Sequence, residues 1–214
     1  MKDSFIQQVN KILPNLDESQ LNQLIATKAL YEIWNQQINV ISRKDMDSFY
    51  MHHVLHSLSL VTLLKFQPGS RILDLGTGGG FPGIPLAIVF PEVHFHLVDS
   101  IGKKIKVVNE VSTALGLKNV TTQHARVEEV KGQFDFVVSR AVAPLVELLS
   151  WTKGKYSGAQ KNALPNGLIC LKGGDLREEI KAVSSSHIVE QYSISDTFQL
   201  EFFETKKIIY AVKR

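Results

Sequence analysis

From residue 71 onward, short apolar runs alternate with amphipathic stretches that have helical spacing. Helical stretches lie between the first six runs, and this alternation is typical of a mostly parallel sheet covered by helices on both faces. The last two runs lack a good helix between them, which predicts an antiparallel hairpin at one end of the sheet. The predicted strands are 71–75, 93–99, 120–124, 134–139, 168–171, 187–194 and 206–213.

The chain before residue 68 has helical rather than strand-like patterns. Asp17 and Gln20 have the spacing of a capping box, so a helix is expected to begin there. We therefore predict two parts, an N-terminal helical segment of residues 1–67 that packs on a core of residues 68–214. The predicted helices of the first part are 4–13, a helix that begins after Asp17, and 48–66.

Composition limits the classes of protein to which the chain can belong. It has 214 residues and a single cysteine, Cys170, which excludes an internal disulfide and a cysteine-based zinc site, and we expect no metal. No apolar run reaches the ~18–20 residues of a membrane helix, and the first residues lack the apolar centre of a signal peptide. We therefore expect a cytoplasmic protein that does not bind membranes. The net charge of +3 permits an anionic partner without requiring one.

A glycine-rich turn follows the first predicted strand. Gly76, Gly78 and Gly80 come directly after the apolar run, and a helix can begin near Pro82, because proline is tolerated in a first helical turn. Glycines let the backbone turn sharply and let a ligand approach it closely. Since ligands of open parallel sheets bind at the carboxyl ends of the strands, this turn is a candidate binding site.

An acidic residue ends the second predicted strand. Asp99 lies 23 residues after Gly76, where its carboxylate can accept hydrogen bonds from both hydroxyls of a ribose. The strand, the glycine turn, the helix and the terminal aspartate together predict a cofactor that contains a nucleoside. The alternative is an ordinary strand-to-helix turn with an incidental aspartate.

The glycine spacing alone does not identify the cofactor. Gly78-x-Gly80-x-x-Gly83 matches the fingerprint of dinucleotide-binding proteins, so NAD is one candidate. Against NAD, the chain is short for separate nucleotide and substrate domains, and Tyr156 has Gln160 rather than a lysine four residues later. No Gly-Lys-Ser/Thr follows the turn, which excludes a Walker-type phosphate loop. S-adenosylmethionine, which has no phosphate, needs backbone contact at the turn, a carboxylate for the ribose and an apolar slot for adenine.

Five motifs follow one another along the chain, namely Asp-Leu-Gly-Thr-Gly-Gly-Gly-Phe-Pro-Gly (74–83), Leu-Val-Asp-Ser (97–100), Arg-Val-Glu-Glu (126–129), Ser-Arg-Ala-Val-Ala (139–143) and Leu-Lys-Gly (171–173). Together they resemble the RsmG (formerly GidB) family of bacterial 16S ribosomal RNA guanine-N7 methyltransferases, over nearly the whole chain. The resemblance implies a class I S-adenosylmethionine-dependent methyltransferase, with a Rossmann-like, mostly parallel seven-stranded sheet and an N-terminal helical cap. It also implies methyl transfer from S-adenosylmethionine to N7 of a guanine in 16S ribosomal RNA, with S-adenosylhomocysteine as the product.

The resemblance also implies roles for individual residues. It places Asn39 and His53, from the N-terminal helices, near the cofactor crevice as positioning residues. From the residues alone, a solvated carboxylate at a helix start is the preferred interpretation of Glu128. For Arg140 the alternative is a surface ion pair, but its place at the carboxyl end of a strand favours a role in the site. The residues that the resemblance places at the cofactor are Gly76, Gly78, Gly80, Phe81, Asp99, Val127, Glu128 and Arg140.

Two positions depart from the family's pattern. The family often has Asn-Leu-Thr where this chain has Asn39-Val40-Ile41. It also often has an acid three residues after the helical histidine, where this chain has His56 three residues after His53. An ion pair or orienting hydrogen bond that the acid makes in the family is therefore in question at His56.

Methylation of guanine N7 requires few catalytic groups. The nitrogen has an exposed lone pair, so no proton has to leave before attack and no general base is expected. Residues 139–144 lack the Asp/Asn-Pro-Pro-aromatic cluster that is typical of exocyclic amine methylation. Cys170 lies in an apolar run, which predicts a core position rather than the nucleophile that pyrimidine methylation would need.

Basic residues gather in loops near the predicted cofactor end, and Arg43 and Lys172 are the candidates for contact with RNA. Such side chains bind phosphate without reading sequence, although each basic group taken alone is more often solvated surface. The expected partner is 16S ribosomal RNA in an assembling small subunit, bound by a monomer. Two alternatives stay open: a methyltransferase for another RNA or a small molecule, and a nucleotide-binding regulator without catalysis.

Overall fold

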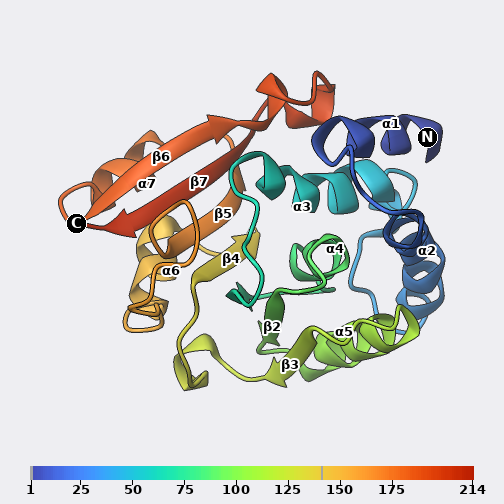
Figure 1. Cartoon of the computed structure of the whole chain (residues 1–214), viewed down its shortest axis with the longest axis horizontal. Helices are drawn as coiled ribbons and strands as arrows, with labels where there is room; N and C mark the ends of the chain where they lie inside the picture. Colours follow the sequence, from blue (N-terminus) through green and yellow to red (C-terminus); the bar gives the residue numbers. More distant parts are fainter. Residues whose placement is uncertain (1, 141) are drawn as a thin grey trace.

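A twisted sheet runs through the centre of the computed structural model, which describes residues 2–140 and 142–214 (Figure 1). Over these residues the sheet has seven strands in the order β3-β2-β1-β4-β5-β7-β6. The first five are parallel, and β7 is antiparallel to both β5 and β6, so the predicted fold class and the terminal hairpin are confirmed. The strands are β1 (Arg71–Leu75), β2 (His94–Asp99), β3 (Val120–His124), β4 (Phe136–Arg140), β5 (Gly167–Gly173), β6 (His187–Ser193) and β7 (Lys206–Lys213).

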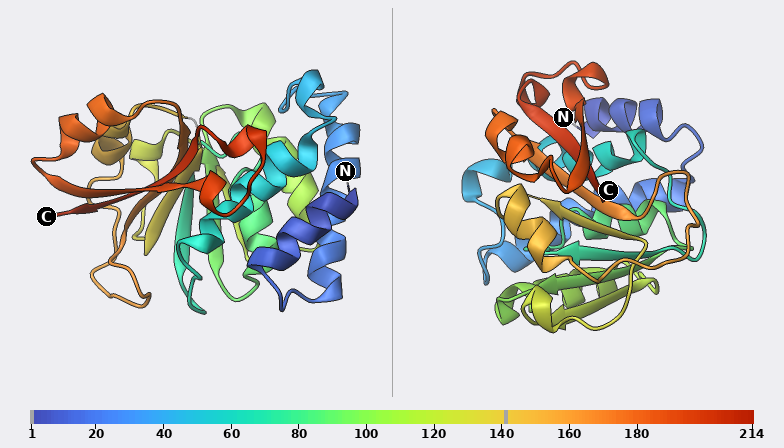
Figure 2. Two further views of the ribbon diagram at one scale, coloured as in Figure 1. Left: turned by 90° about the horizontal axis from the view of Figure 1, so that it is seen from above. Right: turned by 90° about the vertical axis from the view of Figure 1, so that its left-hand side faces the viewer.

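Helices cover both faces of the sheet (Figure 2), and each face has its own apolar core. One face packs against α4, α5 and the N-terminal helices, and the other packs against α6 and α7. Cys170 is buried on the second of these faces, as predicted. The helices are α1 (Lys2–Ile12), α2 (Glu18–Asn35), α3 (His56–Leu58), α4 (Gly83–Val89), α5 (Gly102–Ala114), α6 (Leu145–Trp151) and α7 (Arg177–Val183).

The helix expected between β3 and β4 is absent from the described residues 125–135, which contain one 3₁₀ turn, Val127–Glu129. Because β3 is an edge strand and β4 lies beyond β1, this segment must pass β2 and β1 and return to the start of β4. Three strand spacings amount to about 14 Å, and the return adds the length of a strand. Too few residues remain for an α-helix, so the chain runs extended.

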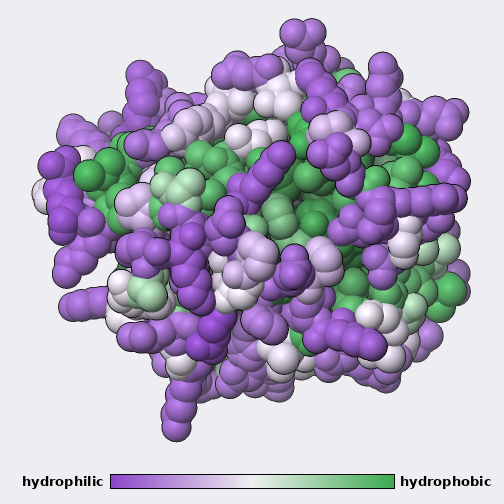
Figure 3. All heavy atoms as spheres, in the orientation of Figure 1, coloured by the Kyte–Doolittle hydropathy of each residue, from purple (hydrophilic) through white to green (hydrophobic). Residues whose placement is uncertain are grey.

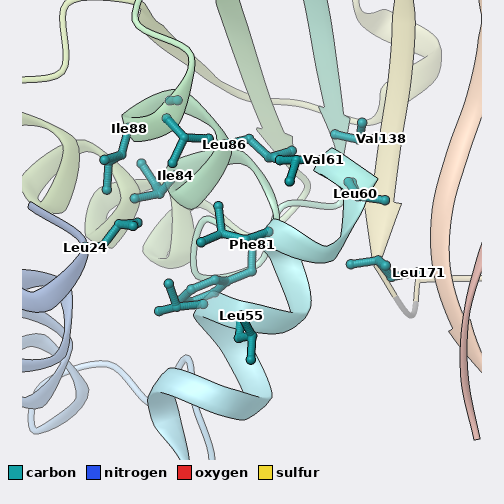
Figure 4. Close-up of a cluster of buried hydrophobic side chains, with 14 of the residues drawn as sticks. Leu24, Leu55, Leu60, Val61, Phe81, Ile84, Leu86, Ile88, Val138 and Leu171 are labelled. Atoms are coloured by element: carbon teal, nitrogen blue, oxygen red, sulfur yellow. The ribbon is translucent and has the colours of Figure 1, made fainter. Parts of the chain in front are cut away.

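The N-terminal segment is joined to the sheet through a common core. Gln20 donates its backbone N–H to the Asp17 carboxylate at 2.7 Å, which confirms the predicted capping box at the start of α2. Side chains from this segment, from the glycine turn and from α4 lie in one apolar cluster, among them Leu24, Leu55, Phe81 and Ile84 (Figure 4). Burial of such a shared apolar surface stabilises the two parts together.

The third predicted helix is irregular and ends earlier than residue 66. A π-helical stretch, Tyr50–Leu55, leads into α3, and a 3₁₀ turn, Ser59–Thr62, follows. The Ser57 hydroxyl donates to the His53 carbonyl at 2.7 Å, and the Ser59 hydroxyl donates to the His56 carbonyl at 2.6 Å. Such hydroxyls compete with the helix's own hydrogen bonds and bend it.

The surface is mostly hydrophilic on the face seen in Figure 3, and apolar side chains show through where its centre is hollowed. Over residues 2–140 and 142–214, the helices are too short or too polar to cross a membrane.

Gly80→Ala is expected to lower the free energy of unfolding by about 2–3 kcal/mol. The reason is that Gly80 has a left-handed backbone conformation and that its surroundings leave no space for a Cβ atom. Its φ is 100°, and an added Cβ would lie 2.6 Å from the Ile84 Cγ1 atom and 2.9 Å from the Tyr31 hydroxyl oxygen. Gly69→Ala is the matched control, since φ is 73° with nothing within 4 Å, and a loss of about 1 kcal/mol is expected. Urea unfolding measures both; equal losses would contradict the steric account.

Candidate active site

The glycine turn follows β1 at the centre of the sheet, where three parallel strands end together. In the strand register Leu75 is level with Val98 of β2 and Ser139 of β4, so the next residues of these strands, Asp99 and Arg140, end beside the turn. The Thr77 N–H donates to the Val98 carbonyl at 2.9 Å and ties the turn to β2. The sheet therefore brings together three of the predicted site positions.

Asp74, which sequence reasoning did not single out, fixes the glycine turn through hydrogen bonds. Its Oδ2 atom accepts hydrogen bonds from the Thr77 hydroxyl at 2.6 Å and from the Gly83 N–H at 2.8 Å, so it connects both ends of the turn. The side chain is fully buried, and burial raises its pKa to about 7 against the lowering effect of those two bonds. An acid inside an apolar strand was the sequence signal for this role.

Asp99 is buried at the end of β2 and is held by two backbone groups. Its Oδ2 atom accepts the Gly78 N–H at 2.9 Å, and its Oδ1 atom accepts the Ile101 N–H at 2.9 Å. Each carboxylate oxygen keeps a further lone pair, so both can accept a hydroxyl hydrogen. The carboxylate is thus fixed in orientation and still able to bind a ribose.

Two hollows meet at the turn. The one beyond β2, here called the β2 hollow, has apolar walls and is also lined by Asp99 and Glu128. The other, here called the turn hollow, lies over the glycines and shares Gly76, Asp99, Ser100 and Val142 with the first. The apolar walls of the β2 hollow are Leu75, Val98, Ala125, Val127 and Trp151. Other residues of the turn hollow are Val40, Gly78, Phe81, Lys104 and Arg140.

The residues of the two hollows fit S-adenosylmethionine. The apolar walls of the β2 hollow suit adenine, the Asp99 carboxylate suits the ribose hydroxyls, and the open backbone of the turn suits the amino-acid end. An added Cβ at Gly76 would lie 2.6 Å from the Val142 Cγ2 atom, so glycine is required where the two hollows join.

Arg140 lies at the end of β4 and is partly buried. One guanidinium nitrogen contacts the His53 Nδ1 atom at 3.1 Å, and the guanidinium carbon lies 4.9 Å from the centre of the Phe81 ring. Burial lowers the pKa of Arg140 to about 10, so it stays charged at neutral pH. Among the described residues, no carboxylate oxygen lies within 4.0 Å of it, and the surface ion pair considered above is therefore wrong.

His53 reaches Arg140 from the N-terminal segment. Burial, and then the charge of Arg140, lowers the pKa of His53 to about 4, so the ring is neutral and its Nδ1 atom can accept from the guanidinium. Tyr31 of α2, which sequence reasoning missed, packs on Phe81 at 5.0 Å between ring centres and donates its hydroxyl to the Gly79 carbonyl. The N-terminal segment therefore supports both the turn and Arg140.

The remaining predicted residues lie in different surroundings. Val127 and Glu128 line the β2 hollow from the 3₁₀ turn after β3. Asn39 is exposed, and its neighbour Val40 lines the turn hollow instead. Ala141 of the Ser-Arg-Ala-Val-Ala motif lies outside the described residues.

The two basic residues predicted to contact RNA differ in whether they are exposed or already paired with a carboxylate. Arg43 is exposed in a 3₁₀ turn, Arg43–Asp45. Lys172 instead donates to the Glu179 carboxylate at 2.8 Å and to the Ala143 carbonyl at 2.9 Å, with only 11% of its side chain exposed. Arg43 is thus free to meet a phosphate, whereas Lys172 is already paired.

Lys155 and Trp151 support the β2 hollow, although neither was predicted. The Lys155 side chain is buried and donates to the Val130 carbonyl at 2.8 Å, directly behind the turn that carries Val127 and Glu128. Trp151, at the end of α6, closes the hollow from the other side. Both belong to a segment between β4 and β5 without a recognisable motif, so no sequence signal pointed to them.

Comparisons with known proteins agree with this geometry. The family described as GidB, rRNA small subunit methyltransferase G, matches residues 19–206. Ribosomal RNA small subunit methyltransferase G of Bacteroides thetaiotaomicron is 57% identical over 94% of this chain and 97% of its own length. The protein of the same name from Porphyromonas gingivalis is 54% identical over 94% of this chain and 91% of its own.

Solved structures share the fold at low sequence identity. The SAM-dependent O-methyltransferase of Thermotoga maritima is 17% identical, with a TM-score of 0.60 over 86% of this chain and 70% of that one. A SAM-dependent methyltransferase from Aquifex aeolicus is 16% identical, with a TM-score of 0.55 over 72% of this chain and 88% of that one. The fold and the site thus define an S-adenosylmethionine-dependent methyltransferase with a Rossmann-like sheet. The chain belongs to the rRNA small subunit methyltransferase G family, which decides against NAD as the cofactor.

Acid is expected to destabilise the protein through His53. Its pKa falls from the ordinary 6.5 to about 4 on folding, so between these values the unfolded chain binds the proton more readily and stability falls as pH falls. From pH 7 to pH 5, the wild type should lose about 1–2 kcal/mol of unfolding free energy relative to His53→Gln. Urea unfolding of both proteins at pH 7 and pH 5 measures this difference. The contributions of the other titrating groups cancel between the wild type and His53→Gln. Equal losses of unfolding free energy in the wild type and in His53→Gln would contradict the lowered pKa of His53.

Proposed function

We propose that the chain transfers the methyl group of S-adenosylmethionine to N7 of a guanine in the 16S RNA of the bacterial small ribosomal subunit. The observation that carries this proposal is the match to rRNA small subunit methyltransferase G over residues 19–206. The contacts at the glycine turn add to it, because they build a site for a nucleoside with a carboxylate-held ribose.

Methyl transfer to guanine N7 requires that the two reactants be positioned, and it requires no proton transfer. S-adenosylmethionine supplies a methyl group that its sulfonium charge has already activated. The lone pair of guanine N7 forms the new bond to the methyl carbon, the carbon–sulfur bond breaks, and the positive charge passes to the purine. Since no proton leaves N7 first, this chain's residues need only hold the partners in line, which can lower the barrier by about 7–11 kcal/mol at best.

Individual roles follow from the contacts. Asp99 would hold the ribose and Val127 with Glu128 would border the adenine, while the turn from Gly76 would face the amino-acid end. Arg140 would act at the mouth of the crevice as a positioning residue, fixed by His53 and Phe81. Asn39, next to Val40, would act from the rim.

The surroundings of the reaction are also part of the proposal. The chain would act as a cytoplasmic monomer on RNA in an assembling small subunit, with Arg43 among its phosphate contacts and Lys172 fixing the loop that follows β4. Residues 1–67 would form a cap that cannot be separated from the core of residues 68–214, because Tyr31 and His53 reach the glycine turn and Arg140.

The protein is expected to transfer a labelled methyl group to small-subunit ribosomal RNA that lacks the modification. The assay uses labelled S-adenosylmethionine with deproteinised 16S RNA and with immature subunits, followed by chain cleavage at N7-methylguanine to locate the label. Label at another atom or base would overturn the guanine-N7 assignment. Cofactor binding without any transfer to either substrate would favour the regulator instead.

Asp99→Ala is expected to weaken binding of S-adenosylmethionine about 10–100-fold, because the hydroxyls lose a charged acceptor and the turn loses its hold on Gly78. Isothermal calorimetry measures the affinity, and circular dichroism shows whether the fold is kept. Glu110→Ala removes an exposed carboxylate from α5 and is the matched control, with unchanged affinity expected. Equal affinities for the two variants would remove Asp99 from the site.

A further inference from the structure

A third hollow adjoins the two at the glycine turn. It lies where β4 and β5 end and β7 begins, and is here called the β5 hollow. It shares Arg140 and Val142 with the turn hollow, so whatever occupies it lies next to the cofactor's amino-acid end. The polar residues that line the β5 hollow are His56, Arg140, Lys172, Glu179 and Lys206.

One cation of this hollow is neutralised within the protein. The Lys172 ammonium lies 2.8 Å from the Glu179 Oε2 atom, and the same oxygen accepts the Leu145 N–H at 2.8 Å. Glu179 therefore serves Lys172 and the start of α6, and its charge is matched. This pair contributes no net charge to a ligand.

Two cations remain without a carboxylate partner. Within the described part of the chain, no carboxylate oxygen lies within 4.0 Å of the Arg140 guanidinium or the Lys206 ammonium. Each instead lies near an aromatic ring, Arg140 at 4.9 Å from the centre of Phe81 and Lys206 at 5.1 Å from that of Phe202. Rings at these distances orient cations but do not cancel their charge.

His56 adds a neutral donor or acceptor rather than a compensating charge. It is buried against Phe202 and Phe203, with ring centres 5.6 Å and 5.8 Å away. Burial, and then the charges of Arg140 and Lys206, lowers its pKa well below the ordinary value. Histidine stands where the resembling family often has an acid, so this position supplies no negative charge to Arg140 and Lys206.

We propose that the β5 hollow binds the phosphate group of the nucleotide whose guanine is methylated, between Arg140 and Lys206. The proposal rests on the function proposed above. The cofactor's own carboxylate does not account for the hollow, because Lys206 lines the β5 hollow and not the turn hollow. A phosphate carries the charge and the several acceptor oxygens that two convergent cations require. Its position would bring the attached guanosine beside the methyl donor.

The phosphate's contribution can be measured without catalysis. Guanosine 5′-monophosphate and guanosine are titrated by calorimetry into protein saturated with S-adenosylhomocysteine. The wild type should bind the monophosphate about tenfold more tightly than the nucleoside. Lys206→Gln should reduce this preference to about twofold, while leaving guanosine affinity unchanged. Equal binding of the two probes by the wild type would overturn the proposal, and this comparison needs no variant.

Lys207→Gln is the matched control. It removes the same charge one residue along β7, and neighbouring strand residues point to opposite faces. This variant should keep the wild-type preference for the monophosphate. The same loss in Lys206→Gln and Lys207→Gln would show that net charge, not the hollow, attracts the phosphate, and would overturn the proposal.

Methylation of ribosomal RNA gives a second readout. Lys206→Gln should raise the KM for RNA about tenfold and lower the slope of log affinity against log salt by about one, whereas Lys207→Gln should not. An unchanged KM and slope in Lys206→Gln would overturn the phosphate contact. Failure of the proposed function looks different, since the wild type would then leave guanine N7 unmethylated whatever its preference between the two probes.

Discussion

The buried Asp74 carboxylate is the contact on which the rest of the site depends. One of its oxygens holds the Thr77 hydroxyl and the Gly83 N–H, which are the two ends of the glycine turn. With the turn fixed in this way, the Gly78 N–H donates to the Asp99 carboxylate, and α4 begins at Gly83 directly after the turn. The orientation of the Asp99 carboxylate therefore rests on a side chain that lines neither the β2 hollow nor the turn hollow.

Local patterns in the sequence predicted the elements of this site well. The apolar run that ends at Leu75, the glycines after it and Asp99 at the end of the next run are all short-range features, and parallel pairing brings strand ends to one edge. The helix before β4 failed as a prediction because the distance that residues 125–135 must span depends on strand order. That order is a property of the whole sheet and cannot be read from one segment.

The sequence could not predict which side chains contact one another in the folded chain. Arg140 is 87 positions from His53, and nothing in either motif predicts that a ring nitrogen meets the guanidinium. Lys172 looked like a free cation because its partner Glu179 lies on α7, beyond the turn that follows β5. In both cases the surrounding side chains decide whether a charge is available to a ligand, and only the folded chain brings them together.

The hydrogen bond from Tyr31 to the Gly79 carbonyl has a consequence for the order in which the chain folds. Tyr31 leaves the ribosome well before the strands β1 and β2 that complete its surroundings. The first helices therefore emerge before the glycine turn and α4, against which part of their apolar face packs in the folded protein. During that interval the nascent chain exposes apolar surface to which a chaperone can bind. Removal of α2 would deprive the glycine turn of its contacts with Tyr31.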